Sequence, residues 1–139
     1  MIALDTNVLV RFYVEDERDR QAARQRKIAL RIMQRSPSLF VPRTVTLELE
    51  WVMRGLYGFG AAAITEAFEH PLGLSNVAVE DRDLVQTALE QMRQGLDFAD
   101  ALHLAASHRC SAMVTLDARR FAKRSNRLGL KPRCSVPMR

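Results

Sequence analysis

The chain has few cysteines and no long apolar segment, and both absences limit what the protein can be. Its 139 residues contain two cysteines, Cys110 and Cys134, which form neither a paired metal-binding spacing nor a disulfide framework. No apolar run approaches the roughly 20 residues that a membrane-spanning helix needs, and Asp5 comes too early for a secretory signal. These features predict two reduced, structural cysteines and a cytoplasmic protein with no membrane association.

Acidic residues are missing from the last part of the chain. None occurs from Ala118 onward, whereas the same stretch contains the basic residues Arg119, Arg120, Lys123, Arg124, Arg127, Lys131, Arg133 and Arg139. Together with a net charge of +5, this distribution favours polyanionic partners. Two interpretations of the basic tail stay open: a phosphate-binding face and a solvated surface.

Apolar residues make up 47% of the chain, which is enough to bury about two thirds of the unfolded surface of a small domain in one core. The length leaves no room for a second domain of ordinary size. We therefore expect residues 1–139 to form a single domain.

Strands and helices are predicted to alternate along the chain. Short apolar runs predict strands at 2–4, 39–42, 75–79 and 112–115, with a last extended piece at 134–136. Helical composition or spacing predicts helices at 15–34, 44–57, 61–70, 81–93 and 98–108, and a short one around Phe121; Pro71 is expected to close the helix at 61–70. This alternation is typical of an α/β sandwich with a central, mainly parallel sheet flanked by helices.

Asp5 stands directly after the first apolar run, Ile2-Ala3-Leu4. A continuous apolar run, with neither helical nor alternating spacing, suits a central strand covered on both faces. In parallel sheets, ligands bind at the carboxyl ends of the strands. Asp5 is therefore a candidate site residue. It could equally cap a helix that begins with Thr6 and Asn7, and the first strand alone does not decide between the two.

Three further acidic residues lie near predicted strands, as Asp5 does. Glu48 is in the helix after the second strand, Asp100 is in the helix before the strand at 112–115, and Asp117 follows that strand. Each also has a structural explanation, because Glu48 could be an exposed helix residue, Asp100 could pair with a cation, and Asp117 could cap a helix. Asp97 lies three residues before Asp100 and could be the N-cap of that helix. In the helix at 44–57, the apolar stripe places Glu48 beside the core and Glu50 toward solvent, although a shift in alignment would exchange them.

If these carboxylates converge, they repel one another strongly, since two charges about 4 Å apart cost roughly 4 kcal/mol at an effective dielectric near 20. Either some are protonated or a divalent cation neutralises them, and a set of oxygen ligands favours Mg²⁺ or Mn²⁺ over zinc. His70, His103 and His108 have no ligand spacing and are interpreted as surface or packing residues.

Four motifs in this order resemble those of the PIN-domain ribonucleases, and specifically the VapC toxins of type II toxin–antitoxin systems. They are Leu4-Asp5-Thr6-Asn7, Glu48-Leu49-Glu50-Trp51-Val52-Met53-Arg54, Asp97-Phe98-Ala99-Asp100-Ala101-Leu102, and Thr115-Leu116-Asp117 followed by Phe121. The resemblance covers nearly the whole chain. It implies a PIN-like sandwich that hydrolyses RNA phosphodiester bonds with a water activated by Mg²⁺ or Mn²⁺.

The resemblance also implies roles for individual residues. Asp5, Glu48, Asp100 and Asp117 would be catalytic, with Asp5, Asp100 and Asp117 binding the metal. Supporting roles, or a further ligand, would fall to Asp97, Thr6, Asn7 and Thr115. RNA would be contacted by Arg43, Arg54, Arg119 and Arg120. The family further implies a homodimer and a cognate antitoxin.

Two other classes of function compete with the endoribonuclease. A non-catalytic RNA-binding or interaction module would account for the basic tail without the acidic positions. A receiver-like or phosphatase-like phosphoacceptor would also place an aspartate after its first strand. The phosphatase pattern has a second aspartate two residues later, where this chain has Asn7.

Overall fold

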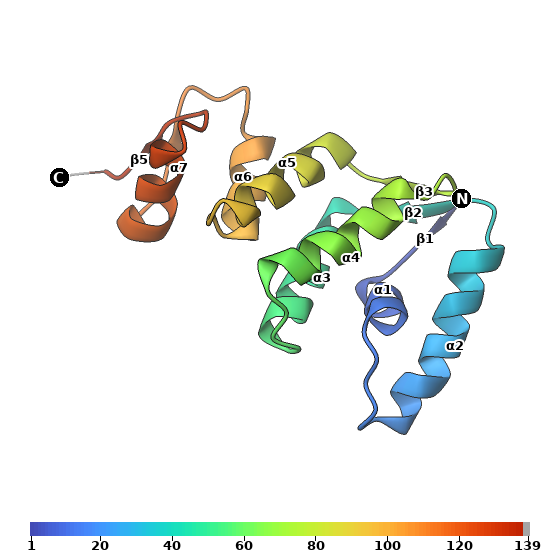
Figure 1. Cartoon of the computed structure of the whole chain (residues 1–139). Helices are drawn as coiled ribbons and strands as arrows, with labels where there is room; N and C mark the ends of the chain where they lie inside the picture. The colour runs from blue at the N-terminus through green and yellow to red at the C-terminus, as the bar shows by residue number, and fades with distance from the viewer. Residues whose placement is uncertain (138–139) are drawn as a thin grey trace. The chain divides into compact units, whose positions relative to one another are not determined.

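The computed structural model describes residues 1–137, which form two compact units, Met1–Arg82 and Asp83 onward (Figure 1). Each unit contains its own parallel strands. None of the described helices is both long and apolar enough to cross a membrane. The prediction of a single domain stays a prediction.

The first unit alternates strands and helices. Its elements are β1 (Ile2–Ala3), α1 (Thr6–Tyr13), α2 (Arg20–Arg35), β2 (Leu39–Val41), α3 (Arg43–Gly55), α4 (Ala61–Gly73) and β3 (Val77–Val79). The three strands form a parallel sheet in the order β1-β2-β3, with Ile2 opposite Leu39 and Leu39 opposite Val77. The predicted α/β architecture with a parallel sheet is therefore confirmed.

The first strand is less buried than its apolar sequence predicts. Ile2 is 56% exposed, and the buried residue is Leu4, which follows the strand. Within this unit β1 is paired on one side only, with β2, so it is an edge strand of the three-stranded sheet. The expectation of a strand covered on both faces is wrong for β1, whereas in β2 both Leu39 and Val41 are buried.

Two helix boundaries in the first unit differ from the prediction. α2 begins at Arg20 and not near residue 15, because the Asp19 side chain caps it by accepting a hydrogen bond from the Gln21 N–H at 2.9 Å. α4 continues past Pro71 to Gly73. Pro71 lies in the last turn and is buried, so its missing N–H removes one hydrogen bond without breaking the helix.

The second unit holds the helices and strands of the C-terminal part. They are α5 (Arg82–Arg93, whose first residue closes the first unit), α6 (Phe98–Ala106), β4 (Met113–Val114), η1 (Ala118–Ala122), α7 (Lys123–Arg127) and β5 (Cys134–Ser135). β4 and β5 pair in parallel, with Met113 opposite Cys134. Buried apolar residues of this unit include Val85, Leu89, Phe98, Leu102 and Phe121. The predicted strand at 112–115 is present but not buried, since Val114 is 63% exposed.

The two cysteines have different environments. Both are free thiols, as predicted. Cys134 is buried, and its Sγ accepts a hydrogen bond from the Ser125 hydroxyl at 3.0 Å, which fits a structural role. Cys110 is exposed, so the prediction of a structural role is wrong for that residue.

Candidate functional site

Asp5 both caps a helix and presents a carboxylate to solvent. It follows β1 and is the N-cap of α1, where its Oδ1 accepts a hydrogen bond from the Thr6 N–H at 2.7 Å. The residue is exposed. The capping interpretation is therefore confirmed, and it leaves the carboxylate accessible to a ligand, so the two interpretations of Asp5 are compatible.

A cavity of about 260 Å³ opens beside Asp5 in the first unit. Glu48 of α3 lines the same cavity, together with Thr6, Asn7, Val10, Arg11, Val52, Leu56 and Tyr57. Arg11 is held in place because its Nε donates to Gln25 Oε1 at 2.8 Å and its guanidinium lies 3.8 Å from the Asp19 carboxylate. Asp5 and Glu48, two of the predicted catalytic carboxylates, thus line one cavity of the first unit, and the Arg11 guanidinium lines it too.

Sequence reasoning missed Arg11 and Tyr57 as lining residues of this cavity. Arg11 had a usable signal, because it lies four residues after Asn7 and so shares that face of α1. Tyr57 was predicted as the last residue of the helix at 44–57, but α3 ends at Gly55, so helical spacing does not apply to the position of its side chain.

Glu48 and Glu50 lie on opposite sides of α3. Helical residues two apart are separated by about 200° around the axis, and Glu48 is exposed at the cavity while Glu50 is only 2% exposed. Glu50 accepts a hydrogen bond from Arg54 Nε at 2.8 Å, one turn later. Glu48 lines the cavity and is exposed, whereas Glu50 is buried, so the predicted placement of Glu48 beside the core and Glu50 toward solvent is reversed. The ion pair with Arg54 is what allows Glu50 to be buried.

The second unit gathers the other three aspartates. Asp97 is the N-cap of α6, with its Oδ1 accepting from the Ala99 N–H at 3.0 Å and the Asp100 N–H at 3.4 Å. Asp117 caps η1 by accepting from the Arg120 N–H at 2.8 Å. Thr115 Oγ1 in turn accepts from the Asp117 N–H at 3.0 Å, so its hydroxyl fixes the backbone that carries Asp117.

Asp100 is the most perturbed carboxyl group of this cluster. Burial raises its pKa above the ordinary value, and the negative charges of Asp97 and Asp117 raise it further, while His103 and Arg124 oppose the shift. Asp97 and Asp117 are therefore both close enough to Asp100 for their charges to repel it within the second unit. Such repulsion is what a bound cation would relieve.

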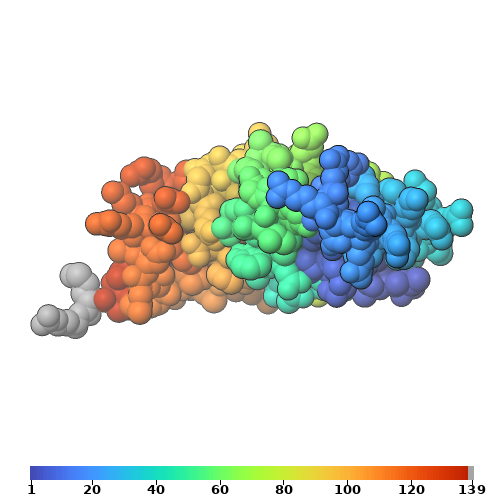
Figure 2. Space-filling view, turned by 90° about the horizontal axis from the view of Figure 1, so that it is seen from below, coloured from blue at the N-terminus to red at the C-terminus, as the bar shows by residue number. Residues whose placement is uncertain are grey.

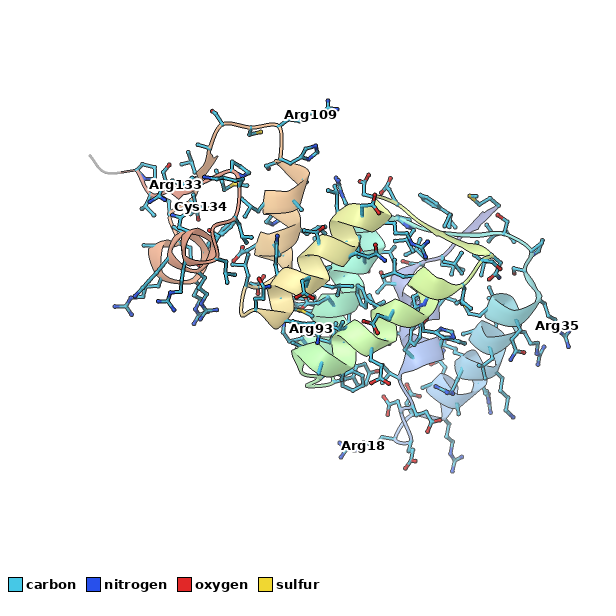
Figure 3. The ribbon with its side chains drawn as sticks, turned by 45° about the horizontal axis from the view of Figure 1, so that its top comes forward. Arg18, Arg35, Arg93, Arg109, Arg133 and Cys134 are labelled. Carbon is cyan, nitrogen blue, oxygen red and sulfur yellow. The ribbon has the colours of Figure 1, made fainter. Side chains whose placement is uncertain are left out.

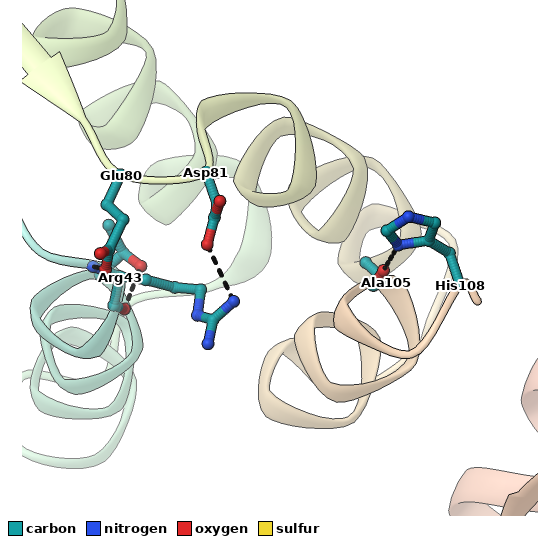
Figure 4. Close-up of polar contacts among 6 residues, drawn as sticks. Arg43, Glu80, Asp81, Ala105 and His108 are labelled. Atoms are coloured by element: carbon teal, nitrogen blue, oxygen red, sulfur yellow. Dashed lines mark hydrogen bonds and ion pairs between the residues drawn. The ribbon is translucent and has the colours of Figure 1, made fainter. Parts of the chain in front are cut away.

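The predicted RNA-binding arginines differ in availability. The Arg43 guanidinium is paired with the Asp81 carboxylate at 2.8 Å, and its backbone N–H donates to Glu80 Oε1 at 2.8 Å (Figure 4). Arg54 donates to the buried Glu50. Arg119 and Arg120 in η1 are exposed. The η1 pair is thus the more accessible of the two pairs.

The histidines are exposed, as expected for surface residues. His108 Nδ1 lies 3.0 Å from the Ala105 carbonyl oxygen at the end of α6 (Figure 4). His70 Nδ1 lies 2.9 Å from the Tyr13 hydroxyl, whose pKa is raised by burial. Both residues thus have local polar partners in the fold.

The donor chemistry of the candidate residues fits a hard divalent cation. Asp5, Asp100 and Asp117 offer carboxylate oxygens, which Mg²⁺ and Mn²⁺ prefer. Within residues 1–137, no three His, Cys, Asp or Glu side chains are already grouped in a metal-holding arrangement. The fit therefore rests on the type of donor and on the mutual repulsion at Asp100.

The sequence matches the PIN domain family over residues 2–126. PIN domains form a superfamily of nucleases that generally use divalent metals. The chain belongs to the PIN domain family, in keeping with the parallel sheet and the carboxylates described above. A comparison with curated proteins found no match.

Proposed function

We propose that this PIN domain is a metal-dependent endoribonuclease that hydrolyses RNA phosphodiester bonds. The observation that carries the proposal is the aspartate cluster of the second unit, where burial and mutual repulsion raise the pKa of Asp100 in a chain of a nuclease family. Carboxylates that repel one another at neutral pH are costly to keep unless they bind a cation. Asp5, Glu48, Asp100 and Asp117 are the proposed catalytic residues.

Asp5, Asp100 and Asp117 are the proposed ligands of Mg²⁺ or Mn²⁺. When bound, the ion supplies an activated water and offsets charge on the phosphate. The chain's own contribution is to hold the carboxylates: Thr115 fixes the Asp117 backbone, and Asp97 caps the helix that carries Asp100. Beside Asp5, the Thr6 backbone N–H donates to the Asp5 carboxylate, and a supporting role for Asn7, which lines the same cavity, comes from the resemblance alone.

Glu48 has a different proposed role. It is exposed in the Asp5 cavity and has the acceptor oxygens to bind the attacking water. Arg119 and Arg120, exposed beside Asp117, are the proposed phosphate contacts close to the aspartates, with Arg43 and Arg54 supporting them.

The four-motif resemblance supports a finer proposal, that the protein is the toxin of a VapC-type toxin–antitoxin pair. It would then act on cytoplasmic RNA, form a homodimer and be blocked by a cognate antitoxin. A cationic antitoxin side chain would be complementary to these carboxylates. Growth arrest on expression, relieved by a co-expressed antitoxin, would support this finer assignment.

The direct test of the nuclease is cleavage of end-labelled RNA by the purified chain. We expect cleavage with Mg²⁺ or Mn²⁺ and none in excess EDTA. Asp117→Asn should lower the rate by at least about 100-fold, the order expected when a group that acts on the reacting atoms is removed. Equal cleavage in EDTA, or by Asp117→Asn, would contradict the proposal.

A non-catalytic RNA-binding module is the second candidate, favoured by the basic residues from Arg119 onward. It predicts RNA binding with no cleavage and no stabilisation by divalent ions. Thermal melting with and without Mn²⁺, together with the cleavage assay, separates the two candidates.

A further inference from the structure

α2 carries a line of exposed basic side chains along its whole length. Within residues 20–47 of the chain there is no acidic residue. Five cations of α2 follow one another at spacings of three or four residues and are all exposed: Arg20, Arg24, Lys27, Arg31 and Arg35. Residues at these spacings share one helix face. We call these five residues the α2 stripe.

The stripe has no ion-pair partner among the residues that the structure describes. A neighbour off the stripe does have one: Arg26 lies 3.4 Å from the Glu15 carboxylate and donates to the Phe12 carbonyl oxygen at 3.0 Å. Like charges three or four residues apart destabilise a helix. Repulsion within the stripe therefore destabilises α2, and a bound polyanion would offset that repulsion.

Packing of the first unit does not require these cations. The buried face of α2 consists of Ala22, Ala29 and Met33, and α2 lies beside α1 (Figure 1). α2, light blue in Figure 2, is at the surface in that view, and Arg35 extends away from the ribbon in Figure 3. The side chains of the stripe are thus accessible to a ligand.

We propose that the α2 stripe is a docking surface for the phosphate backbone of RNA. The identity of the ligand rests on the proposed function, while the charge complementarity comes from the structure. The stripe extends over roughly 22 Å, at about 1.5 Å per residue. Arginine and lysine contacts of this kind position a nucleic acid without reading its bases.

The composition of α2 restricts the proposal further. The helix contains no aromatic residue on which a base could stack. The stripe should therefore bind RNA strands of different sequence equally well, so any sequence preference of the enzyme must come from other residues.

The test is RNA binding by a variant with three stripe charges removed, Arg24→Gln/Lys27→Gln/Arg31→Gln. Glutamine preserves helix propensity, and circular dichroism checks the fold. Fluorescence anisotropy with a labelled 20-nucleotide RNA is measured in EDTA, in an Asp5→Asn background that prevents cleavage. We expect at least tenfold weaker binding and a salt-dependence slope reduced by about 2, since each phosphate that is no longer neutralised lowers the slope by roughly 0.7.

The matched control removes three exposed arginines elsewhere, Arg82→Gln/Arg93→Gln/Arg109→Gln. If this control weakens binding as much as the stripe variant, net charge is responsible and the proposal fails. It also fails if the stripe variant binds RNA like the parent, which would leave an acidic protein segment as the fitting occupant. Because the assay needs no cleavage, its outcome is independent of whether the nuclease assignment holds.

Discussion

At the scale of single residues, Asp5 has two roles that substitution separates. Its Oδ1 caps α1, and its carboxylate lines the cavity that it shares with Glu48. Asparagine caps a helix about as well as aspartate but is a poor ligand for a divalent cation, whereas alanine does neither.

Asp5→Asn should therefore abolish cleavage while leaving stability near that of the parent. Asp5→Ala should abolish cleavage and also lower the free energy of unfolding by about 1 kcal/mol, the usual value of an N-cap. Urea unfolding and the RNA cleavage assay on the same preparations measure both effects. An active Asp5→Asn protein would exclude Asp5 from the metal site.

The ionised Asp100 carboxylate should lower the stability of the fold in the absence of metal. A carboxyl group whose pKa is raised by folding holds its proton more tightly in the folded chain, so its ionisation destabilises the fold as the pH rises above the ordinary value of 3.8. Asp100→Asn removes this charge. In EDTA, we expect the variant to melt at a higher temperature than the parent at pH 7, and the difference to disappear below about pH 4.

Thermal melting across this pH range is the measurement, with Glu66→Gln on α4 as the control, because Glu66 is exposed and far from the aspartates in sequence. The control should show no comparable gain. If Asp100→Asn is less stable than the parent at pH 7, favourable contacts stabilise the Asp100 carboxylate, and the prediction that its charge destabilises the metal-free fold is wrong.

Single residues were the part of the site most open to prediction. Asp5, Glu48, Asp97, Asp100 and Asp117 stand out in the sequence by their position after strands or in short motifs. Glu50 was placed wrongly, because helical periodicity orders residues around α3 but does not show that Arg54 provides an ion pair for a buried carboxylate. The α2 stripe was not predicted, because its individual arginines look like an ordinary solvated face.

At the scale of elements, α3 provides an internal comparison between two glutamates. Glu48→Gln should leave stability unchanged and lower the cleavage rate by at least about 100-fold, since Glu48 is exposed in the cavity. Glu50→Gln should retain cleavage but lower the free energy of unfolding by roughly 1.5 to 3 kcal/mol, as it weakens a buried, charged hydrogen bond. Cleavage assays and urea unfolding of both variants would reveal the opposite pattern if the roles were exchanged.

Element boundaries were predictable where a cap or a breaker acts alone. β2, α3 and α5 were placed within about two residues of the prediction. The start of α2 was not, because residues 15–18 have helix-forming composition and only the Asp19 cap sets the boundary. The end of α4 was missed because a proline in the last turn costs little there.

At the scale of the whole molecule, the alternation of strands and helices was enough to predict a parallel α/β fold, and the PIN family match agrees with it. The strand order was not predictable, because pairing depends on contacts distant in sequence, such as Ile2 with Leu39. The exposure of Ile2 was missed for the same reason, since an apolar run does not show whether its strand has neighbours on both sides.

Whether the chain cuts RNA internally with a divalent metal can be measured by the cleavage of a circular RNA. A circle has no ends, so only an endonuclease can convert it to a linear product. We predict that the parent protein linearises the circle in Mn²⁺ or Mg²⁺, and that EDTA or Asp100→Asn prevents this. A circle that stays intact with metal, or is cut equally in EDTA, would show that the chain is not a metal-dependent endoribonuclease.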